Sequence, residues 1–555
     1  MPWRRTSRYK RCTSVADFDA VSLQVVWQEL IAAADEMGFT LVRTSFSTIV
    51  KDNKDFATCV VDGEGNLLAQ STESVPSYIG MIPITVRHLM AAHPSADLRP
   101  GDVLATNDPW LAAGHLHDLM TAAPVFHRGR LVAWVVAISH MPDIGGALSA
   151  FATEVYGEGL CLPPLKLVDE GREVQQLFDL IAANVRYPSE VLGDLRAQLS
   201  ALTVGGRKVI ETLESHGLAD ISSFGSALFD RSERFMRSQI GKLIEPGIYS
   251  SELETDGFDR PLKIRATVTV TDGSVLIDFE GTDAQIDRPV NSVLNYTYAM
   301  SVYPFKCLLD PETPINEGSF RPFAVSAPEG TLVNPRRPAA VWSRHLIGHY
   351  LPFLIFDAIA PHTRGRVMAE SGSPSWAGYF RGSLNGRTFN HTLFANGGTG
   401  ARSDRDGVST MSFPSNTSNI PVEILENTVP LRVIRRALIA DSGGVGRYRG
   451  GLGQEIAVEM LEGVDGRLTI RHEHVRFPPR GLLGGGPGRR GRNLINGREV
   501  APKGEYPLTA GDIVSFELPG GGGIGDPQLR DPASAEADRA AGYVTGTPES
   551  VGAAP

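Results

Sequence analysis

Two histidines and an aspartate lie within four positions of each other in the segment GHLHDLM, residues 114–120. His115, His117 and Asp118 are residue types that bind divalent metals, and such a ligand set leaves open positions where water or substrate can bind and be polarised. The spacings His-x-His and His-x-x-Asp are common, so polar groups at the end of a strand are the alternative interpretation. The flanking elements are needed to distinguish a metal site from polar groups at the end of a strand.

A β-hairpin is predicted directly after this segment. Residues 123–140, APVFHRGRLVAWVVAISH, contain two apolar runs separated by a two-residue turn at 128–129. Counting back from that turn along both arms places His140 opposite His117. In a regular strand Asp118 would point to the other face of the sheet, so its participation in a site requires a bulge or a strand end nearby. We predict such an irregularity.

The opening part of the chain combines one helix with short strands. From Asp17 onward apolar residues recur every three or four positions, which predicts an amphipathic helix that stops near Gly38. Residues 56–70 indicate two short strands around a DGEGN turn. Strands are therefore expected to dominate the core of this region.

Later segments differ in their periodicity. Apolar residues return to helical spacing between about 173 and 245, a hairpin turning at Asp272-Gly273 follows, and short β-like runs after residue 430 predict an antiparallel sandwich or barrel. We predict an α+β fold: a multi-domain mixed α/β chain with a β-hairpin-rich N-terminal region, a helical block and an antiparallel β C-terminal domain. The predicted divisions are a disordered basic tail (1–16), an N-terminal α+β metal-site domain (17–172), a helical block (173–245), a mixed α/β domain (246–430), a C-terminal β-rich domain (431–527) and a short helix with a flexible tail (528–555).

Composition and charge restrict the class of protein. With 555 residues, 42% of them hydrophobic and 21% charged, the chain should fold into several soluble globular units. The formal net charge of -10 argues against a general affinity for nucleic acid or anionic lipid. No apolar run reaches the roughly 20 residues that a membrane helix needs. The four cysteines are widely spaced and form no CxxC, which favours a cytoplasmic location over a disulfide framework.

The glycine-rich stretches do not predict a nucleotide site. Residues 481–493 (GLLGGGPGRRGRN) and 519–527 (PGGGGIGDP) neither match the loop G-x-x-x-x-G-K-S/T nor open an apolar helix, so turns are expected there. Residues 471–477 (RHEHVRF) add two histidines in strand alternation. This alternation indicates one strand face at a surface or interface rather than a second metal site.

Several long motifs resemble those of one family. NDPWLAAGHLHD (107–118), SHMPDIGG (139–146) and EGLCLPP (158–164) resemble the patterns NDPY-x-GG-THLPD, HH-x-DIGG and EEG-x-x-xPP of the hydantoinase B/oxoprolinase family, in the same order and at similar spacing. The likeness continues in NKDFATCVVDGEGNLLAQ, NGGTGARSDRDG and LPGGGGIGDPQLRDP. It covers nearly all of residues 17–545.

This resemblance implies a ligand set for one divalent metal ion, Mn, Zn or Fe. The family's ligand positions fall on His115, Asp118 and His140. His117 stands where the family usually has proline, so we expect it beside the ligands rather than on the metal. Met141 replaces the second histidine of the HH-x-D motif, and we therefore expect a substrate preference that differs from that of better-known members.

Carboxylates close to the ligands are candidates for proton transfer. Asp143 and Asp108 could fix an imidazole tautomer or take a proton from a bound water, and we predict them as catalytic residues. The alternative is a structural role, because Asn107-Asp108-Pro109 is a strong turn signal and Asp143 precedes Ile-Gly-Gly. Asp55 falls in a stretch that corresponds to the family's E-x-x-DFS, where a solvated charge is an equal alternative.

The resemblance implies a B-type subunit of an ATP-dependent cyclic amide hydrolase that opens hydantoins, 5-oxoproline or related lactams. A hydantoinase A-type subunit would bind ATP and phosphorylate the amide oxygen, and metal-bound water on this chain would attack the activated carbon. We therefore expect a cytoplasmic hetero-oligomer with that partner, acting on a small-molecule cyclic amide. Two alternatives stay open: a subunit of an ATP-dependent carboxylase of acetone or acetophenone, which would need bicarbonate, and a non-catalytic scaffold subunit.

Overall fold

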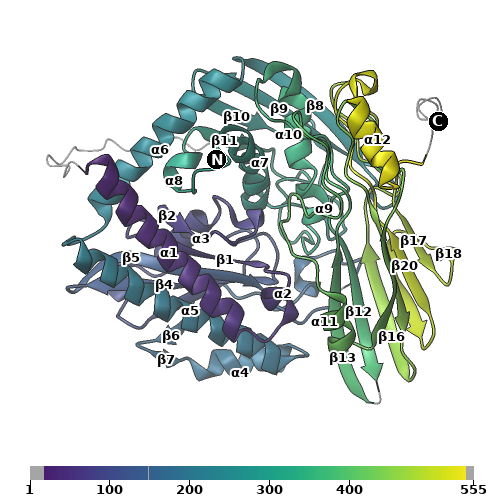
Figure 1. Ribbon diagram of the computed structural model, residues 1–555. Helices are drawn as coiled ribbons and strands as arrows, with labels where there is room; N and C mark the ends of the chain where they lie inside the picture. The colour runs from purple at the N-terminus through teal and green to yellow at the C-terminus, as the bar shows by residue number, and fades with distance from the viewer. Residues whose placement is uncertain (1–17, 148, 385, 546–555) are drawn as a thin grey trace.

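Four β-sheets and the helices around them make up the described part of the chain, which confirms the predicted mixed α+β class (Figure 1). The computed structural model describes residues 18–147, 149–384 and 386–545. The predicted basic tail, residues 1–16, and the last part of the predicted C-terminal tail, residues 546–555, lie outside the described residues. Within the described part of the chain, no helix combines the length and the apolar character needed to span a bilayer.

The N-terminal sheet carries the histidine hairpin. Its seven strands lie in the order β2-β1-β5-β4-β3-β6-β7, and each is antiparallel to its neighbours. Alternate residues of β5 enter two different cores, Trp134 and Val136 on one side and Val135 and Ala137 on the other. Burial on both faces explains why these strands are nearly continuous apolar runs. The strands are β1 (Phe56–Asp62), β2 (Leu67–Gln70), β3 (Val103–Thr106), β4 (Asp118–His127), β5 (Arg130–His140), β6 (Leu165–Asp169) and β7 (Arg172–Glu173).

The hairpin β4–β5 turns at Arg128-Gly129 as predicted, with both residues at positive φ. A bulge near residue 125 then shifts the register, so that His140 pairs with Asp118. Asp118 is the first residue of β4, so the strand end predicted near it is confirmed. The predicted pairing of His140 with His117 is wrong, because the extra residue of the bulge moves every later pair by one position.

Long helices cover one face of this sheet (Figure 1). Helix α1 (Ala20–Thr44) packs against α5 (Pro188–Ser215), and α5 packs on β4 and β5. The sequence predicts an end of α1 near Gly38, but the helix continues to Thr44. A Cβ at Gly38 would lie 3.1 Å from the Phe56 ring, so this glycine allows close packing instead of ending the helix. The other helices of this part are α2 (Thr48–Lys51), α3 (Ile82–Ala92), α4 (Gln175–Asn184) and α6 (Ser222–Leu243).

A second sheet, in the order β11-β10-β9-β8, contains the predicted hairpin turn at Asp272-Gly273. Strand β11 runs parallel to β10. The buried side chains of this sheet join those of α7, α10 and one face of the N-terminal sheet in a common core. The elements are β8 (Gly247–Thr255), β9 (Leu262–Thr271), β10 (Ser274–Asp278), β11 (Phe323–Ser326), α7 (Leu294–Leu309), α8 (Glu317–Phe320), α9 (His345–Gly348) and α10 (Leu351–Ile359).

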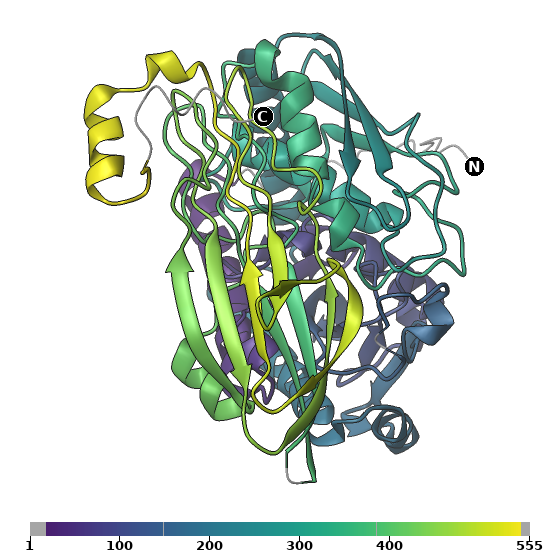
Figure 2. The same ribbon diagram turned by 90° about the vertical axis from the view of Figure 1, so that its right-hand side faces the viewer.

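The C-terminal part is an antiparallel β-sandwich (Figure 2). One sheet has the order β13-β12-β16-β19, the other β14-β15-β20-β17-β18, and both contribute side chains to one core. Strands β12 and β13 precede residue 431, so the sandwich draws on the chain before the predicted domain boundary, and the boundaries themselves stay a prediction. The elements are β12 (Trp376–Leu384), β13 (Arg387–Ala395), β14 (Leu431–Leu438), β15 (Gln454–Met460), β16 (Val464–Arg471), β17 (Arg492–Ile495), β18 (Arg498–Glu499), β19 (Lys503–Thr509), β20 (Ile513–Glu517), α11 (Val422–Thr428) and α12 (Pro532–Ala540).

The glycine-rich stretches are mostly extended chain. Apart from one turn at residues 483–484, these stretches lie between other main-chain segments. Gly523, for example, donates its N–H to Gly486 O at 2.9 Å. A Cβ at Gly521 would lie 2.0 Å from Thr399 O. The prediction of turns is therefore wrong for most of these residues, because glycine is needed here for close approach of backbones rather than for chain reversal.

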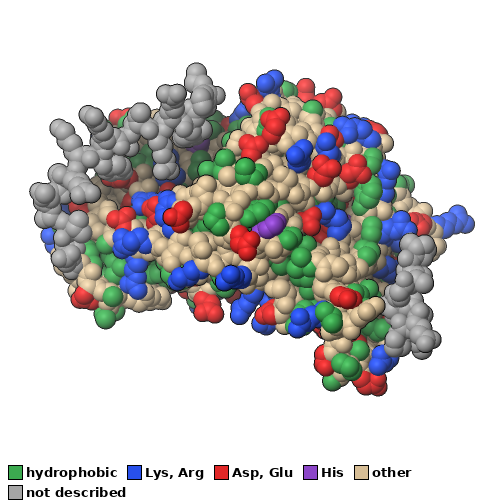
Figure 3. Space-filling model, turned by 90° about the horizontal axis from the view of Figure 1, so that it is seen from above, with side chains coloured by type: hydrophobic (Ala, Val, Ile, Leu, Met, Phe, Trp, Pro, Cys, Tyr) green, Lys and Arg blue, Asp and Glu red, His purple; other side chains and the backbone are tan. Residues whose placement is uncertain are grey.

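The surface carries charges of both signs. On the face shown in Figure 3, Lys and Arg side chains are interspersed with Asp and Glu. This distribution agrees with the modest formal net charge of -10. On this face the mixture of charges gives no strong basic field of the kind that favours general binding to nucleic acid.

We predict that Gly521→Ala destabilises the protein by about 3 kcal/mol, because the new methyl group would force packed backbones apart. The exposed Gly157, around which a Cβ would meet no atom within 4 Å, provides the control Gly157→Ala. Urea unfolding of the two variants measures the difference. Equal unfolding midpoints would contradict the close-packing role of Gly521.

Candidate metal centre

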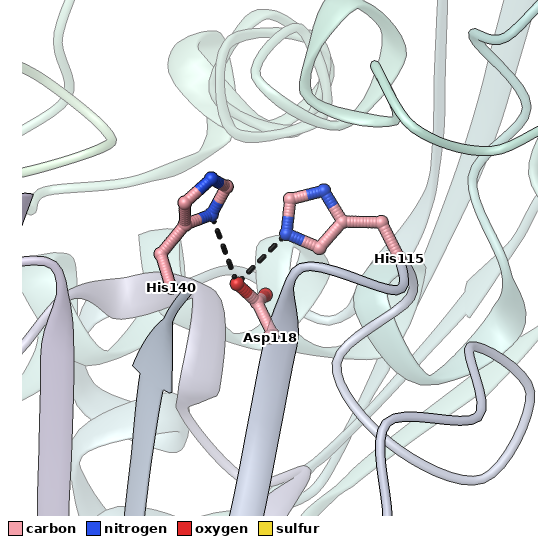
Figure 4. A group of neighbouring side chains, drawn as sticks. All are labelled: His115, Asp118 and His140. Atoms are coloured by element: carbon pink, nitrogen blue, oxygen red, sulfur yellow. Dashed lines mark hydrogen bonds and ion pairs between the residues drawn. The ribbon is translucent and has the colours of Figure 1, made fainter. Parts of the chain in front are cut away.

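Two histidines and one aspartate meet at the end of the β4–β5 hairpin (Figure 4). His115 lies in the loop before β4, Asp118 is the first residue of β4, and His140 is the last residue of β5. Asp118 Oδ1 lies 2.7 Å from His115 Nε2 and 3.2 Å from His140 Nδ1. One candidate ligand atom from each residue lies within 4.8 Å of the others. The fold thus brings together the three residues that the resemblance assigns to the metal.

A hydrogen bond from a distant segment orients His115. Its Nδ1 lies 3.0 Å from the main-chain carbonyl of Trp342, and a carbonyl only accepts, so Nδ1 carries the proton and Nε2 presents a lone pair. Buried Nε2 has no hydrogen-bond partner and faces a carboxylate oxygen of Asp118. Two such electron-rich atoms repel each other unless a cation lies between them. The residues therefore fit a divalent metal, and the Trp342 carbonyl has the orienting role found beside many metal-bound histidines.

The Trp342 carbonyl is itself held in place. Glu158 accepts the N–H groups of Val341 and Trp342, each at 2.9 Å. Burial raises the pKa of Glu158 to about 7. The EGLCLPP motif, which begins with Glu158, therefore supports His115 through the backbone of residues 341–342.

Asp118 is a buried charge with an ion-pair partner. Its Oδ2 accepts from Arg344 Nη2 at 2.6 Å, and Arg344 Nε donates to the Ala113 carbonyl at 2.6 Å. Burial alone would raise the pKa of Asp118, but the adjacent His115 and Arg344 hold it well below its usual value. Burial and the Arg344 charge lower the pKa of His115 to about 4. At neutral pH these two residues are a carboxylate and a neutral imidazole, which are the forms that bind metals.

Asp55 lies beside this group, directly before β1. Its Oδ2 is 3.9 Å from His140 Nδ1, and its Oδ1 accepts from the Tyr78 hydroxyl at 3.2 Å. Burial raises the pKa of Asp55. Asp55 lines the same cavity as the three candidate ligands, so it is a site residue by position rather than a solvated charge.

The two carboxylates predicted as catalytic residues do not line this cavity. Asp143 pairs with Arg186 at 2.7 Å. Asp108 pairs with Arg337 and accepts the Trp110 N–H at 3.0 Å. These are the contacts expected for the structural alternative, and a catalytic role for either residue stays a prediction.

His117 is close to the candidate ligands but is not one of the three that converge. Its ring stacks between those of His140 and Trp342, with centroid distances of 5.1 and 5.8 Å. Burial lowers the pKa of His117 well below its usual value. The expected position beside the ligands agrees with this packing.

Residues 342–349 supply four cavity side chains that the sequence motifs do not single out: Trp342, Arg344, His345 and His349. The spacing His345-x-x-x-His349 was the available signal, because residues four apart share one side of a helical turn. Burial and the Arg344 charge lower the pKa of His349 to about 3. The cavity has a volume of about 60 Å³, and the rest of its lining is Asp55, Val75, Ser77, Tyr78, Tyr296, Ser375, Tyr379, Phe394, Ser415 and Thr417.

Fold and site together define a multi-sheet α+β protein with a candidate two-histidine, one-carboxylate metal centre at the end of a hairpin. The chain belongs to the hydantoinase B/oxoprolinase family, whose sequence profile matches residues 19–527.

Relatives extend along nearly the whole chain. An uncharacterized protein of Methanocaldococcus jannaschii is 32% identical over 534 residues, which cover 92% of each chain. The putative B-type subunit of a D-/L-hydantoinase from a Pseudomonas species is 30% identical, and the match covers 96% of this chain and 94% of that protein. The crystal structure of an ATP-dependent caprolactamase from Pseudomonas jessenii superposes with a TM-score of 0.87 at 27% identity, over 95% of both chains.

We predict that His115→Ala, Asp118→Asn and His140→Ala each weaken binding of Mn²⁺ or Zn²⁺ by at least about 100-fold, since each removes a ligand. Titration calorimetry and metal analysis of the purified protein measure the loss. The control is His117→Phe, which keeps a stacking ring and should retain the metal. Equal losses in the control and the ligand variants would refute the assignment.

Proposed function

We propose that this chain is the metal-holding B-type subunit of an ATP-dependent cyclic amide hydrolase. The observation that carries the proposal is the convergence of His115, Asp118 and His140, whose candidate ligand atoms lie within 4.8 Å of one another, with buried His115 Nε2 2.7 Å from Asp118 Oδ1. Family membership supports it, as does the similarity to a putative hydantoinase subunit and to an ATP-dependent caprolactamase.

The proposal includes a partner that binds ATP. The printed sequence contains no G-x-x-x-x-G-K-S/T loop. The similar hydantoinase protein is named as one subunit of its enzyme, which fits a chain that works beside a second one. We assign phosphorylation of the amide oxygen to an A-type partner. Phosphorylation makes the amide carbon a better electrophile, since it removes the resonance donation that protects a planar amide.

The chemistry on this chain would be the opening of the activated ring. A divalent ion held by the three ligands would supply a Lewis acid that polarises the reacting groups. Water adds to the carbonyl carbon, the ring C–N bond breaks, and a second water hydrolyses the resulting acyl phosphate. Asp55, with its raised pKa and its place 3.9 Å from His140, would take the proton of the attacking water and return it to the leaving nitrogen.

Arg344 would position the carboxylate ligand during this reaction. Its hydrogen bonds to Asp118 Oδ2 and to the Ala113 carbonyl leave Asp118 Oδ1 directed at the two imidazoles. Because Arg344 is buried and makes both contacts, Asp118 has little freedom to swing away.

We predict that the chain, purified with its ATP-binding partner and supplied with Mn²⁺ or Zn²⁺, hydrolyses ATP in response to cyclic amides and releases ring-opened product without added bicarbonate. Coupled ATPase assays and mass spectrometry over a panel of hydantoins, lactams and ketones provide the test. Turnover that requires bicarbonate and a ketone would favour the carboxylase alternative. No response to any substrate in either condition would overturn the proposal.

Replacement of Asp55 tests the proton-transfer role. We expect Asp55→Asn to lower kcat by about 100-fold or more while the metal content stays unchanged. Asp52→Asn is the control, because Asp52 lies three positions away and does not line the cavity. If Asp55→Asn kept full activity, or if it lost the metal, the role proposed for Asp55 would be wrong.

A further inference from the structure

Arg471 is a buried charge without a hydrogen-bond partner. It is the last residue of β16 and the first residue of the stretch RHEHVRF. The residue is 3% exposed, and within the part of the chain that the structure describes none of its three guanidinium nitrogens has a hydrogen-bond partner. Burial lowers the pKa of Arg471, but a guanidinium keeps its proton at neutral pH. Buried polar atoms are seldom left in this state.

Nearby groups compensate this charge only in part. Tyr379 and Glu158 favour the charged form of Arg471, but no described oxygen lies in hydrogen-bonding geometry to it. Glu158 already accepts the N–H groups of Val341 and Trp342. Because burial raises the pKa of Glu158 to about 7, this carboxylate is only partly charged at neutral pH.

A second arginine adds to the positive charge. Arg381, on the neighbouring strand β12, further lowers the pKa of Arg471 through its own charge. Its Nη2 donates to the Thr469 hydroxyl at 3.4 Å, while its Nε is buried without a partner. This part of the sandwich therefore offers buried donors and positive charge to an anion.

Aromatic rings hold the Arg471 guanidinium beside the metal cavity. Its central carbon lies 3.4 Å from the centre of the Trp342 ring and 4.9 Å from that of the Tyr379 ring. Both rings border the cavity. Stacking positions a guanidinium and offsets part of its charge, but the N–H groups at its edge remain available to an acceptor.

The cavity must enlarge before it can hold a substrate. Its volume of about 60 Å³ is well below the roughly 300 Å³ of a small-ligand pocket. Displacement of the Trp342 or Tyr379 ring would enlarge the cavity and bring Arg471 into its lining. A substrate would then contact the candidate metal position, held by the β4–β5 hairpin, and a cation from the sandwich.

We propose that Arg471 binds the phosphoryl oxygens of the activated substrate. This inference rests on the proposed function. A phosphoryl group carries about two negative charges and three acceptor oxygens, which match the forked donors of a guanidinium. Every substrate of the proposed reaction acquires this group, whatever its ring. A fixed buried cation therefore suits the phosphoryl group better than a carboxylate that only some cyclic amides carry.

Inorganic phosphate is the probe for the binding step, and it requires neither the partner nor turnover. We expect the full chain with one equivalent of Mn²⁺ to bind phosphate, and Arg471→Met to weaken this binding by at least about 10-fold. Arg471→Lys, which keeps the charge but not the fork, should retain part of the affinity. Isothermal titration calorimetry measures all three affinities.

Arg467→Met is the matched control. Arg467 lies four positions earlier on the same strand, is largely exposed and pairs with Glu505 at 3.1 Å. Its replacement should leave phosphate binding unchanged. Unchanged affinity in Arg471→Met, an equal loss in Arg467→Met, or no binding to the original chain would each overturn the proposal.

The stability of the ligand-free chain separates a binding role of Arg471 from a structural one. An unpaired buried charge costs free energy, so we expect Arg471→Met to unfold in urea at or above the midpoint of the original protein and to bind Mn²⁺ as before. A lower midpoint together with loss of the metal would show that Arg471 supports the backbone at Trp342, and would overturn the proposal.

Two lactams distinguish the phosphoryl group from a substrate carboxylate as the bound anion. 2-Pyrrolidinone is neutral, and 5-oxoproline has the same ring with a carboxylate. With the ATP-binding partner present, we expect Arg471→Met to lower kcat/KM for each of them by a similar factor of at least about 10. A loss confined to 5-oxoproline would overturn the phosphoryl assignment. If the original complex hydrolyses no cyclic amide, the proposed function fails, and the phosphate titration still decides whether Arg471 binds an anion.

Discussion

The buried carboxylate of Asp118 is the constraint on which the site depends. A charge removed from water is tolerated only when other charges and hydrogen bonds compensate it. Here Arg344 binds one oxygen at 2.6 Å, and the other oxygen faces His115 and His140. Arg344 therefore stabilises the carboxylate in the folded chain, while the second oxygen remains directed at the candidate metal position.

Two distant parts of the chain meet at this carboxylate. The β4–β5 hairpin and the loop before it provide the three candidate ligands. The segment before α10 provides Arg344 and the Trp342 carbonyl, 226 and 227 positions away from their partners. Glu158 links the two parts by holding the backbone at Trp342. The common core of the N-terminal sheet, α7 and α10 fixes the position of these two parts relative to each other. The orientation of His115 thus depends on contacts with a distant segment and not only on the loop that carries it.

The local sequence pattern predicts most of the helices and strands discussed above and part of the candidate site. The hairpin turn at Arg128-Gly129 follows from two apolar runs, and the candidate ligands His115, Asp118 and His140 follow from the resemblance of two motifs to those of one family. The apolar pattern does not reveal the bulge near residue 125, so counting from the turn places the partner of His140 one position away from the observed Asp118. At Gly38 the pattern predicts a helix end that the structure does not have, because periodicity cannot distinguish a glycine that ends a helix from one that allows a neighbouring ring to pack closely.

Contacts between segments more than 200 positions apart have no periodic signal, so the sequence pattern does not indicate that Arg344 lies beside Asp118. The central claim is that one ion occupies the position between His115, Asp118 and His140. Anomalous diffraction from crystals of the Mn²⁺-loaded protein tests it most directly. We expect one strong peak at about 2.0–2.3 Å from His115 Nε2, His140 Nδ1 and Asp118 Oδ1. A peak elsewhere in the molecule, or no peak at saturating Mn²⁺, would contradict it.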